Sequence, residues 1–325
     1  MRTFPGRFEL IRAGLLLAAA LCSGAAAAQD VWPSRPIRII VPSPAGGLPD
    51  VAARLITKPI GDALGQPLVM DPRPGVAGNI AADLTAKAKP DGYTFLLTTM
   101  STHGIAPSIF KTLPFHPVDD FVAVARVMEN PLVLYVSDTT GIKNINDLIA
   151  YARANPGKLN YGSVGPGSVS HLAVAMLAAA SHLRMVHVPF KGYADVQQGL
   201  KSGDLQLAFL PGYTSTPGGT SVAVASRTRF ARMPNLPTLV ELGMTEVYLG
   251  NWFGFVAPAK TPQAIVERFA DQLAIAMKDP ALLERLQGIS AVPSFLRTRE
   301  FEAFYVGEIA RLRPVVAAAG ATAAD

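Results

Sequence analysis

The fold is decided by the stretch Ile37-Arg38-Ile39-Ile40-Val41-Pro42-Ser43-Pro44-Ala45-Gly46-Gly47-Leu48-Pro49-Asp50. Residues 37–41 are rich in β-branched side chains and end at a proline, which predicts a buried strand followed by a turn. The paired glycines of the turn let a ligand approach the backbone, and Pro49 suits the first turn of a helix. From residue 51 to residue 64, apolar residues recur at helical spacing. This strand, turn and helix predict an α/β protein.

The same alternation continues along the chain. Further apolar runs predict strands over residues 68–70, 94–98, 132–136, 185–188, 205–210, 221–225 and 253–257. Between them, helical spacing predicts helices over residues 79–88, 145–154, 170–180, 194–201, 262–277 and 298–319. Strands that alternate with helices predict largely parallel sheets covered by helices on both faces.

Length and composition point to a globular protein of two lobes. The chain has 325 residues, of which 50% are hydrophobic and 16% charged, so it can bury a large core and is too long for one ordinary core. Its formal net charge is +5. No block of lysine and arginine interleaved with aromatic residues occurs, so we expect no nucleic-acid partner.

The first 28 residues have the pattern of a signal peptide. Arg2, Arg7 and Arg12 precede an apolar run, and Ala26-Ala27-Ala28 supplies the small residues of a cleavage site. We therefore expect export to the periplasm, cleavage near Ala28 and a soluble mature chain. The only cysteine, Cys22, lies inside this leader, so the mature chain would have neither disulfides nor thiol chemistry.

Three turns are candidates for binding an anion. Besides residues 42–50, residues 161–171 form a second turn, in which Ser168 can act as the N-cap of the helix that follows. Residues 98–104 follow a strand and are rich in hydroxyl groups. Helix N-termini carry free N–H groups that bind anions without a buried lysine or arginine. Two such turns facing one cleft could hold a carboxylate.

The whole mature chain resembles the Bug family, the substrate-binding receptors of tripartite tricarboxylate transport systems. The resemblance is carried, in order, by Trp32-Pro33-Ser34-Arg35-Pro36-Ile37-Arg38, Pro44-Ala45-Gly46-Gly47, Asp50, Pro74-Gly75-Val76-Ala77-Gly78-Asn79-Ile80, Pro90-Asp91-Gly92-Tyr93-Thr94, Asn155-Pro156-Gly157-Lys158-Leu159-Asn160-Tyr161-Gly162-Ser163, Ser170-His171-Leu172, Val186-His187-Val188-Pro189-Phe190-Lys191-Gly192, Leu236-Pro237-Thr238 and Trp252-Phe253-Gly254.

The resemblance implies a two-lobed type II periplasmic-binding-protein fold, with each lobe a largely parallel sheet covered by helices. Lobe 1 would comprise residues 29–129 and 251–325, and lobe 2 residues 130–250. The lobes would close around a small organic anion, a carboxylate or dicarboxylate. Carried over by position, the ligand-binding residues would be Ser43, Ala45, Gly46, Gly47, Ser101 and His103 from lobe 1, and Ser163, Gly165, Ser168 and Ser170 from lobe 2.

Two departures from the family pattern bear on the ligand. The family usually has an aromatic residue at the position of Ser43, so one wall of the pocket would lack a ring. After the strand at 205–210 the family commonly has an aspartate, whereas here Pro211 begins a shorter segment. A ligand amine would have no acidic partner, so dicarboxylates are expected to bind better than amino acids.

Other functions are less well supported by the residues. A Ser/His hydrolase could use His171 with the nearby serines, but no G-x-S-x-G elbow occurs and no acid is placed to orient the histidine. The remaining histidines lack metal-ligand spacing, so we expect no catalytic residue, no metal and no cofactor. A periplasmic sensor that presents its ligand to a membrane signalling protein is the alternative to a transport receptor. A monomer that meets integral-membrane transporter or sensor subunits is expected in either case.

Overall fold

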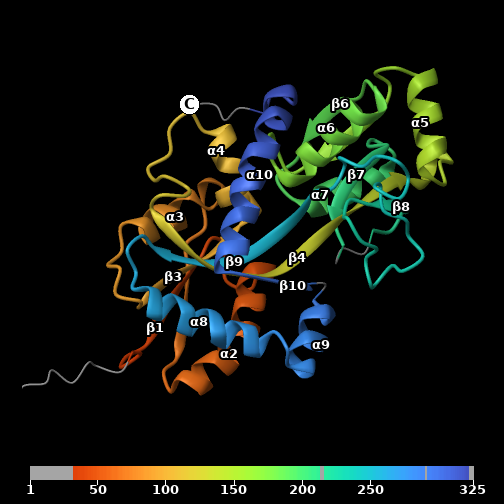
Figure 1. Ribbon diagram of the computed structural model, residues 1–325. Coiled ribbons are helices and arrows are strands. Elements are labelled where there is room, and N and C mark those ends of the chain that lie inside the picture. The colour runs from red at the N-terminus through yellow and green to blue at the C-terminus, as the bar shows by residue number, and fades with distance from the viewer. Residues whose placement is uncertain (1–31, 213–215, 290, 322–325) are drawn as a thin grey trace, which may run out of the picture.

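A computed structural model describes residues 32–212, 216–289 and 291–321. The predicted leader, residues 1–28, lies outside the described residues. Figure 1 shows two groups of helices and strands joined by long strands that run between them. Within the described ranges, no helix is both long and apolar enough to cross a membrane.

The elements alternate along the chain as the sequence predicts. The strands are β1 (Ile37–Val41), β2 (Leu68–Pro72), β3 (Thr94–Thr99), β4 (Phe121–Ser137), β5 (Asn160–Ser163), β6 (Val186–Pro189), β7 (Leu207–Pro211), β8 (Gly219–Val224), β9 (Gly250–Pro258) and β10 (Val292–Arg297). The helices are α2 (Leu48–Leu64), α3 (Asn79–Ala86), α4 (Ala106–Ile109), α5 (Ile145–Ala154), α6 (Val169–Ser181), α7 (Tyr193–Ser202), α8 (Gln263–Ala276), α9 (Pro280–Gly288) and α10 (Thr298–Ala318), with short helical turns η1 (Val76–Gly78), η2 (Met100–Ile105) and η3 (Asp138–Thr140).

The strands form one continuous sheet in the order β2-β1-β3-β9-β4-β7-β5-β6, with β8 and β10 also pairing with β4. We call the part around β1, β2, β3 and β10 the first lobe, and the part around β5 to β8 the second lobe. Pairs β1–β2, β1–β3, β5–β6 and β5–β7 are parallel. Strands β4 and β9 pair antiparallel with their neighbours. The expected α/β class is confirmed. The sheet contains both parallel and antiparallel pairs, because a chain that crosses between lobes and returns must reverse direction.

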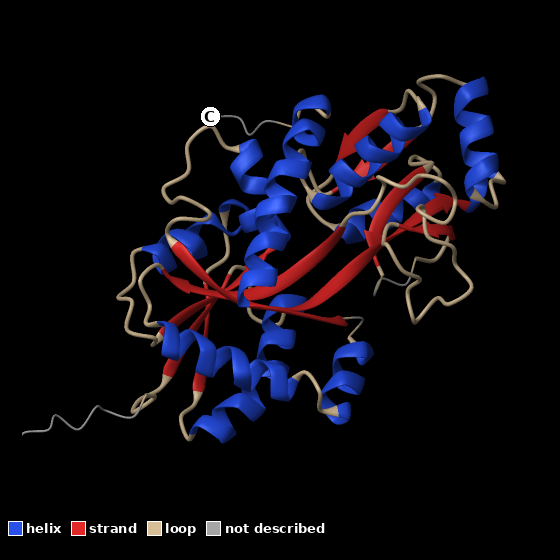
Figure 2. Cartoon of the chain, viewed as in Figure 1, coloured by secondary structure: helices blue, strands red, loops and turns tan. Residues whose placement is uncertain are grey.

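Helices cover both faces of the first-lobe strands, as Figure 2 shows in blue around the red sheet. Ile39 of β1 packs in a core with Ile56 of α2 and Phe269 of α8. The next residue, Ile40, belongs to a second core that includes Phe301 of α10. All of these side chains are fully buried. A strand buried on both faces reads as a continuous apolar run, which is why residues 37–41 are recognisable in the sequence.

The long strand β4 connects the lobes. Its residues 121–131 pair with β9, and residues 125–129 also pair with β10. Its residues 132–137 pair with β7 and β8. The change of partner lies next to Glu129 and Asn130, where the sequence places the first crossing. We call β4 and β9 the hinge strands, and the division at 129/130 and 250/251 stays a prediction.

Candidate ligand cleft

A cavity of about 400 Å³ lies where the turns after the strands of both lobes meet the hinge strands. The first lobe contributes the turn after β1, the turn after β2 and the start of η2; the second lobe contributes Tyr193 and Pro211; the hinge contributes Asn130, Asn251 and Phe253. In open α/β sheets, ligands bind outside the carboxyl ends of the strands. The cavity has this position.

The lining of the cavity is uncharged and combines apolar walls with a few polar side chains. Among the described residues that line it there is no Asp, Glu, His, Lys or Arg. Its walls contain five prolines together with Leu48, Ala77 and the rings of Tyr193 and Phe253, and its polar side chains are Ser43, Thr99, Ser101, Asn130 and Asn251. Such a site would hold an anion through neutral donors and would contact a hydrocarbon portion of the ligand through its walls.

The register of the hinge strands decides which residues face the cavity. Asn130 pairs with Asn251, whereas the next pair along the strands is Glu129 with Trp252. Because successive side chains point to opposite faces of a sheet, the two asparagines face the cavity and Glu129 and Trp252 face away. Glu129 and Trp252 line a different cavity on the opposite face.

The turn before α2 is shaped by a buried carboxylate. The side chain of Asp50 is 3% exposed; it accepts a hydrogen bond from the Gly46 N–H at 2.9 Å and two from Arg54 at 3.0 Å each. Burial acts to raise the pKa of Asp50, but the bonds from Arg54 and Gly46 and the charge of Arg54 leave it lowered. The carboxylate therefore stays ionised and fixes the turn.

The predicted residues of this turn divide into two kinds. Ser43 lines the cavity. Ala45 and Gly46 are exposed, and the N–H groups of Gly46 and Gly47 are bonded within the turn, to Asp50 and to the Pro44 carbonyl. Gly46 has φ +81°, a conformation that favours glycine. The glycines thus set the course of the backbone beside the cavity.

Ser101 and His103 lie on the same helical turn, η2, but in different surroundings. Ser101 lines the cavity. His103 is fully buried; its Nδ1 is 2.6 Å from Thr98 Oγ1, and its ring packs on Phe121 and Tyr305 at centroid distances of 4.7 and 5.7 Å. This burial lowers the pKa of His103 to about 3. We correct the expectation for His103, which is a core residue and not a cleft residue.

The turn of the second lobe is held together by its own side chains. Ser163 Oγ is 2.6 Å from His187 Nε2 and accepts a bond from the Gly165 N–H at 3.1 Å. Ser168 is the N-cap of α6, as predicted, and accepts the His171 N–H at 3.2 Å. Ser163 and Ser170 are fully buried.

This turn lies beside the cavity and does not line it. Among the described residues, none of Ser163, Gly165, Ser168 and Ser170 lines the cavity. Gly167 packs so closely on Ile109 of the first lobe that a Cβ there would lie 2.1 Å from the Ile109 side chain. The turn therefore touches the first lobe at α4.

Two histidines of the second lobe are stacked and electrically neutral. The rings of His171 and His187 are 4.1 Å apart and nearly parallel, and the His171 Nδ1 accepts the Gly167 N–H at 3.1 Å. Burial, with a smaller effect from His187, lowers the pKa of His171 to about 4. Within the described part of the chain, no carboxylate is bonded to either ring. The orienting acid that a Ser/His hydrolase needs is not found beside the Ser163–His187 pair.

Sequence reasoning missed the cleft residues that come from outside the three turns. Asn130 and Asn251 were placed at the lobe crossings but not in the site. Pro211 was noted only as the start of the segment that replaces the family aspartate, and Tyr193 and Phe253 were not proposed as ligand contacts. A polar residue such as Asn251 beside an apolar strand is a weak signal that could have been followed. Tyr193 gives no local signal, because a tyrosine at the start of a helix is most simply interpreted as packing.

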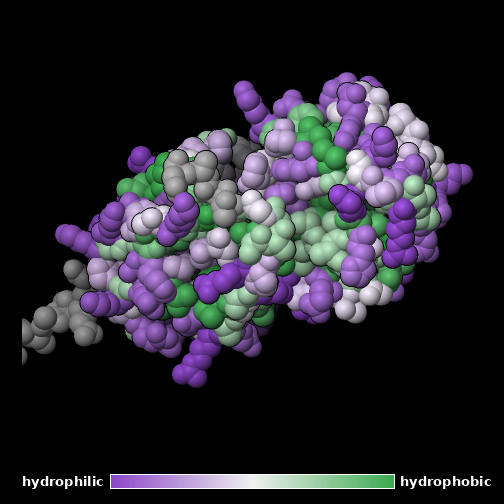
Figure 3. Space-filling view, turned by 90° about the horizontal axis from the view of Figure 1, so that it is seen from above, coloured by the Kyte–Doolittle hydropathy of each residue, from purple (hydrophilic) through white to green (hydrophobic). Residues whose placement is uncertain are grey.

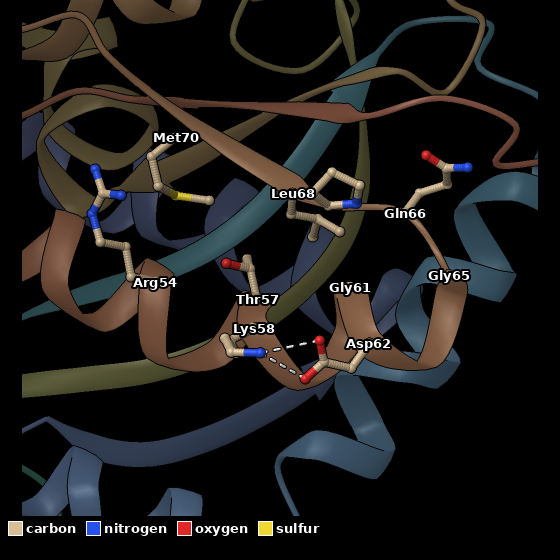
Figure 4. A pocket seen from close by; sticks show the side chains of 10 residues that line it. Arg54, Thr57, Lys58, Gly61, Asp62, Gly65, Gln66, Leu68 and Met70 are labelled. Atoms are coloured by element: carbon tan, nitrogen blue, oxygen red, sulfur yellow. Dashed lines mark hydrogen bonds and ion pairs between the residues drawn. The ribbon is translucent and has the colours of Figure 1, made fainter.

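A second groove, of about 550 Å³, lies on the first lobe between α2 and β2. Figure 4 shows its charged side chains, including the ion pair between Lys58 and Asp62 at 2.9 Å. It runs past Gly65 and Gln66 to Leu68, the first residue of β2, and so lies at the amino end of that strand. Neither its position nor its single-lobe lining suits a ligand that two lobes enclose.

Comparison with known proteins is consistent with this geometry. The family model described as "Tripartite tricarboxylate transporter family receptor" matches residues 52–321. The chain is 30% identical to the protein BugT of Bordetella pertussis over 298 residues, which are 90% of this chain and 91% of that protein.

Solved structures show the same likeness. The chain is similar to R. palustris Rpa4515 with adipate (TM-score 0.77, 31% identity, 90% of this chain and 99% of that one). It is also similar to MatC of Rhodopseudomonas palustris with bound malate (TM-score 0.72, 28% identity, 88% of this chain and 100% of that one). The fold is that of the periplasmic binding proteins, and the chain belongs to the tripartite tricarboxylate transporter family of receptors, which are solute-binding proteins and not enzymes.

Proposed function

We propose that this receptor binds a small dicarboxylate in the cleft and delivers it to a tripartite tricarboxylate-type membrane transporter. The observation that carries the proposal is the lining of the cleft, which offers hydroxyl and amide groups and apolar walls but no charged side chain among the described residues. Neutral donors can bind carboxylates without the additional desolvation of a cationic side chain that a buried ion pair requires. The relatives solved with adipate and with malate bind ligands of this class.

The polar residues of the cleft divide between the ends of such a ligand. Ser43 and Ser101 stand on the first lobe, and Asn130 and Asn251 on the hinge strands. On closure of the lobes, the turn of the second lobe, with Ser163, Gly165, Ser168 and Ser170, would approach the other carboxylate. The first N–H groups of α6 and α2 are donors of the required kind.

An amino acid should be a poorer ligand. Its ammonium group would lose water in the cleft and find no carboxylate among the residues that line it, which is costly for a buried charge. Pro211, the last residue of β7, offers no acidic side chain.

The leader, residues 1–28, bears on where the receptor meets its ligand. Residues 1–28 would direct export and be removed near Ala28, so the receptor would meet its ligand in the periplasm. N-terminal sequencing of the exported protein should begin near Gln29.

Calorimetry tests the ligand class. Succinate and adipate should bind. Aspartate and glutamate should bind with affinities at least about tenfold lower, because their ammonium group lacks a partner. Ser101→Ala should weaken dicarboxylate binding by about fivefold through the loss of one hydrogen bond, and Ser108→Ala, outside the residues that line the cleft, serves as the matched control. A preference for an amino acid would contradict the proposal.

A further inference from the structure

The cleft contains an aromatic ring on the lobe opposite to the one where the family pattern has it. Ser43 stands on the first lobe, where the resemblance implies an aromatic residue, and both Ser43 and Tyr193 line the same cavity. Tyr193 belongs to the second lobe and is the first residue of α7, directly after the N-cap Gly192. A ring is therefore present in the cleft although residue 43 is a serine.

The position of Tyr193 is fixed by the core of the second lobe. Val196 and Leu200 of α7 are fully buried in a core cluster with Val133 and Leu210, and Tyr193 itself packs partly against that cluster. Figure 1 shows α7 in the second lobe close to the hinge strands. Tyr193 thus packs partly on the core of its lobe and also lines the cleft.

Several apolar side chains line the same cavity as Tyr193. Pro211 also comes from the second lobe, and Leu48, Ala77 and Phe253 come from the first lobe and the hinge. Apolar walls favour a ligand with methylene groups, since each CH₂ that is removed from water adds to the affinity. Because Tyr193 is on the second lobe, its ring reaches such a ligand when the lobes close.

We propose that Tyr193 is a specificity-determining residue that packs its ring on the hydrocarbon chain between the two carboxylates of the ligand. It would supply from the second lobe a ring such as the resemblance implies at position 43. The ring makes the receptor prefer a longer dicarboxylate, such as the six-carbon adipate, to the four-carbon succinate. The inference rests on the proposed function, because it names the part of a dicarboxylate that this residue contacts.

The test is a double-mutant cycle of Tyr193→Ser and Ser43→Phe, with succinate and adipate measured by calorimetry on each variant. Tyr193→Ser should weaken adipate binding by about tenfold and succinate binding by about threefold or less, since succinate has fewer methylene groups to lose contact. Ser43→Phe should tighten adipate binding by about fivefold in the Tyr193→Ser background and by less in the wild-type background, because the restored ring replaces the lost one.

Two further variants keep the role of the ring separate from those of the hydroxyl group and of folding. Tyr193→Phe should bind adipate within about threefold of the wild type, because it keeps the ring. Tyr193→Leu, which retains apolar packing against the core of the second lobe, should show an intermediate loss and should melt like the wild type without ligand. The heat-capacity change of adipate binding should be less negative in Tyr193→Ser, as less apolar surface is buried.

The outcomes distinguish the two proposals. If the wild type binds no dicarboxylate, the proposed function fails. If the wild type binds adipate and Tyr193→Ser and Tyr193→Leu bind it equally well, only the role of Tyr193 is overturned. An equal loss of succinate and adipate in these variants would also overturn it, because a contact with the chain must depend on chain length.

Discussion

The two faces of the hinge strands have opposite electrostatic character. On the cleft face, Asn130 and Asn251 stand among uncharged residues. On the other face, Glu129 borders a cavity of about 370 Å³ that is also lined by Arg126, Arg227, Glu308 and Arg311. Asn130 and Glu129 are adjacent residues of β4. Because successive side chains of a strand point to opposite faces, one lies on the neutral face and the other on the charged face.

The charges on the second face are used to hold the structure together. Arg311 of α10 makes two bonds with Glu308, at 2.7 and 2.8 Å. Arg311 and Arg227 also lie over the ring of Tyr248, at 4.4 and 3.8 Å from its centroid. Burial raises the pKa of Glu129, although the nearby Arg126 acts in the opposite direction. Arg311 and Glu308 are thus paired with each other on the face away from the cleft, whereas the described residues that line the cleft are uncharged. Figure 3 shows that hydrophilic side chains also project around the outside of both lobes.

A charge placed on the cleft face should have the largest effect on ligand affinity. Asn251→Asp, nearly the same in shape, puts a negative charge beside the bound dicarboxylate and should weaken its binding by about 100-fold, since opposed like charges cost several kcal/mol. The matched control is Thr228→Asp, which adds the same charge to the cavity on the opposite face. Calorimetry should show a change of about threefold or less for this control. Equal losses for both variants would remove the distinction between the faces.

Loss of the carboxylate that shapes the first-lobe turn should have a smaller effect. Asp50→Ala leaves the Gly46 N–H without its acceptor and Arg54 without its partner, and it should cost about 1–2 kcal/mol of unfolding free energy and about tenfold in dicarboxylate affinity. Asp50→Asn can still accept the Gly46 N–H and should recover most of the affinity. Urea unfolding and calorimetry give the two quantities. A turn that needs no acceptor at position 50 would show wild-type affinity in Asp50→Ala.

A change of pH should affect stability and leave ligand affinity almost unchanged. The pKa of His103 is lowered to about 3 and that of His171 to about 4, so the unfolded chain binds protons at these sites that the folded chain does not. The free energy of unfolding therefore has its full value above about pH 6.5. It falls as the pH decreases from there toward 4, by up to about 1.4 kcal/mol per pH unit for each histidine.

The ligand should respond differently, because no carboxylate or histidine is found among the described residues that line the cleft. Dicarboxylate affinity should stay constant between about pH 8 and pH 6.5, where the ligand remains ionised. Urea unfolding between pH 6.5 and pH 4 measures the loss of stability. His171→Asn should reduce the slope of stability against pH. A steep change of affinity above pH 6.5 would point to a titrating group in the cleft.

The sequence predicts the parts of the fold whose signals are local. Helix α5 is found at the predicted residues 145–154, and β1 at 37–41. The first part of β4 was missed because Arg126 and Glu129, which face the charged cavity, interrupt its apolar pattern. Strands β5 and β10 were missed because one is four residues long and contains Gly162, and the other contains Pro293.

The candidate site was predictable only in part, because some of its residues have no local sequence signal. The glycine and serine turns can be recognised individually, and Ser43 and Ser101 do line the cleft. Tyr193 and Asn251 reach it through the pairing and packing of distant segments, which no local pattern records. His103 follows a strand and looks like a ligand residue in the sequence, but the aromatic side chains of Phe121 and Tyr305 enclose it.

We propose that the neutral face of the hinge strands binds a dicarboxylate, and native mass spectrometry of the exported protein shows which small molecule it retains. Wild-type protein should carry one small dicarboxylic acid, identified by its accurate mass, and Thr228→Asp should carry the same molecule. Asn251→Asp should be empty. An amino acid or another molecule with an ammonium group in the wild type, or a dicarboxylate retained equally by Asn251→Asp, would show that the neutral face does not bind a dicarboxylate.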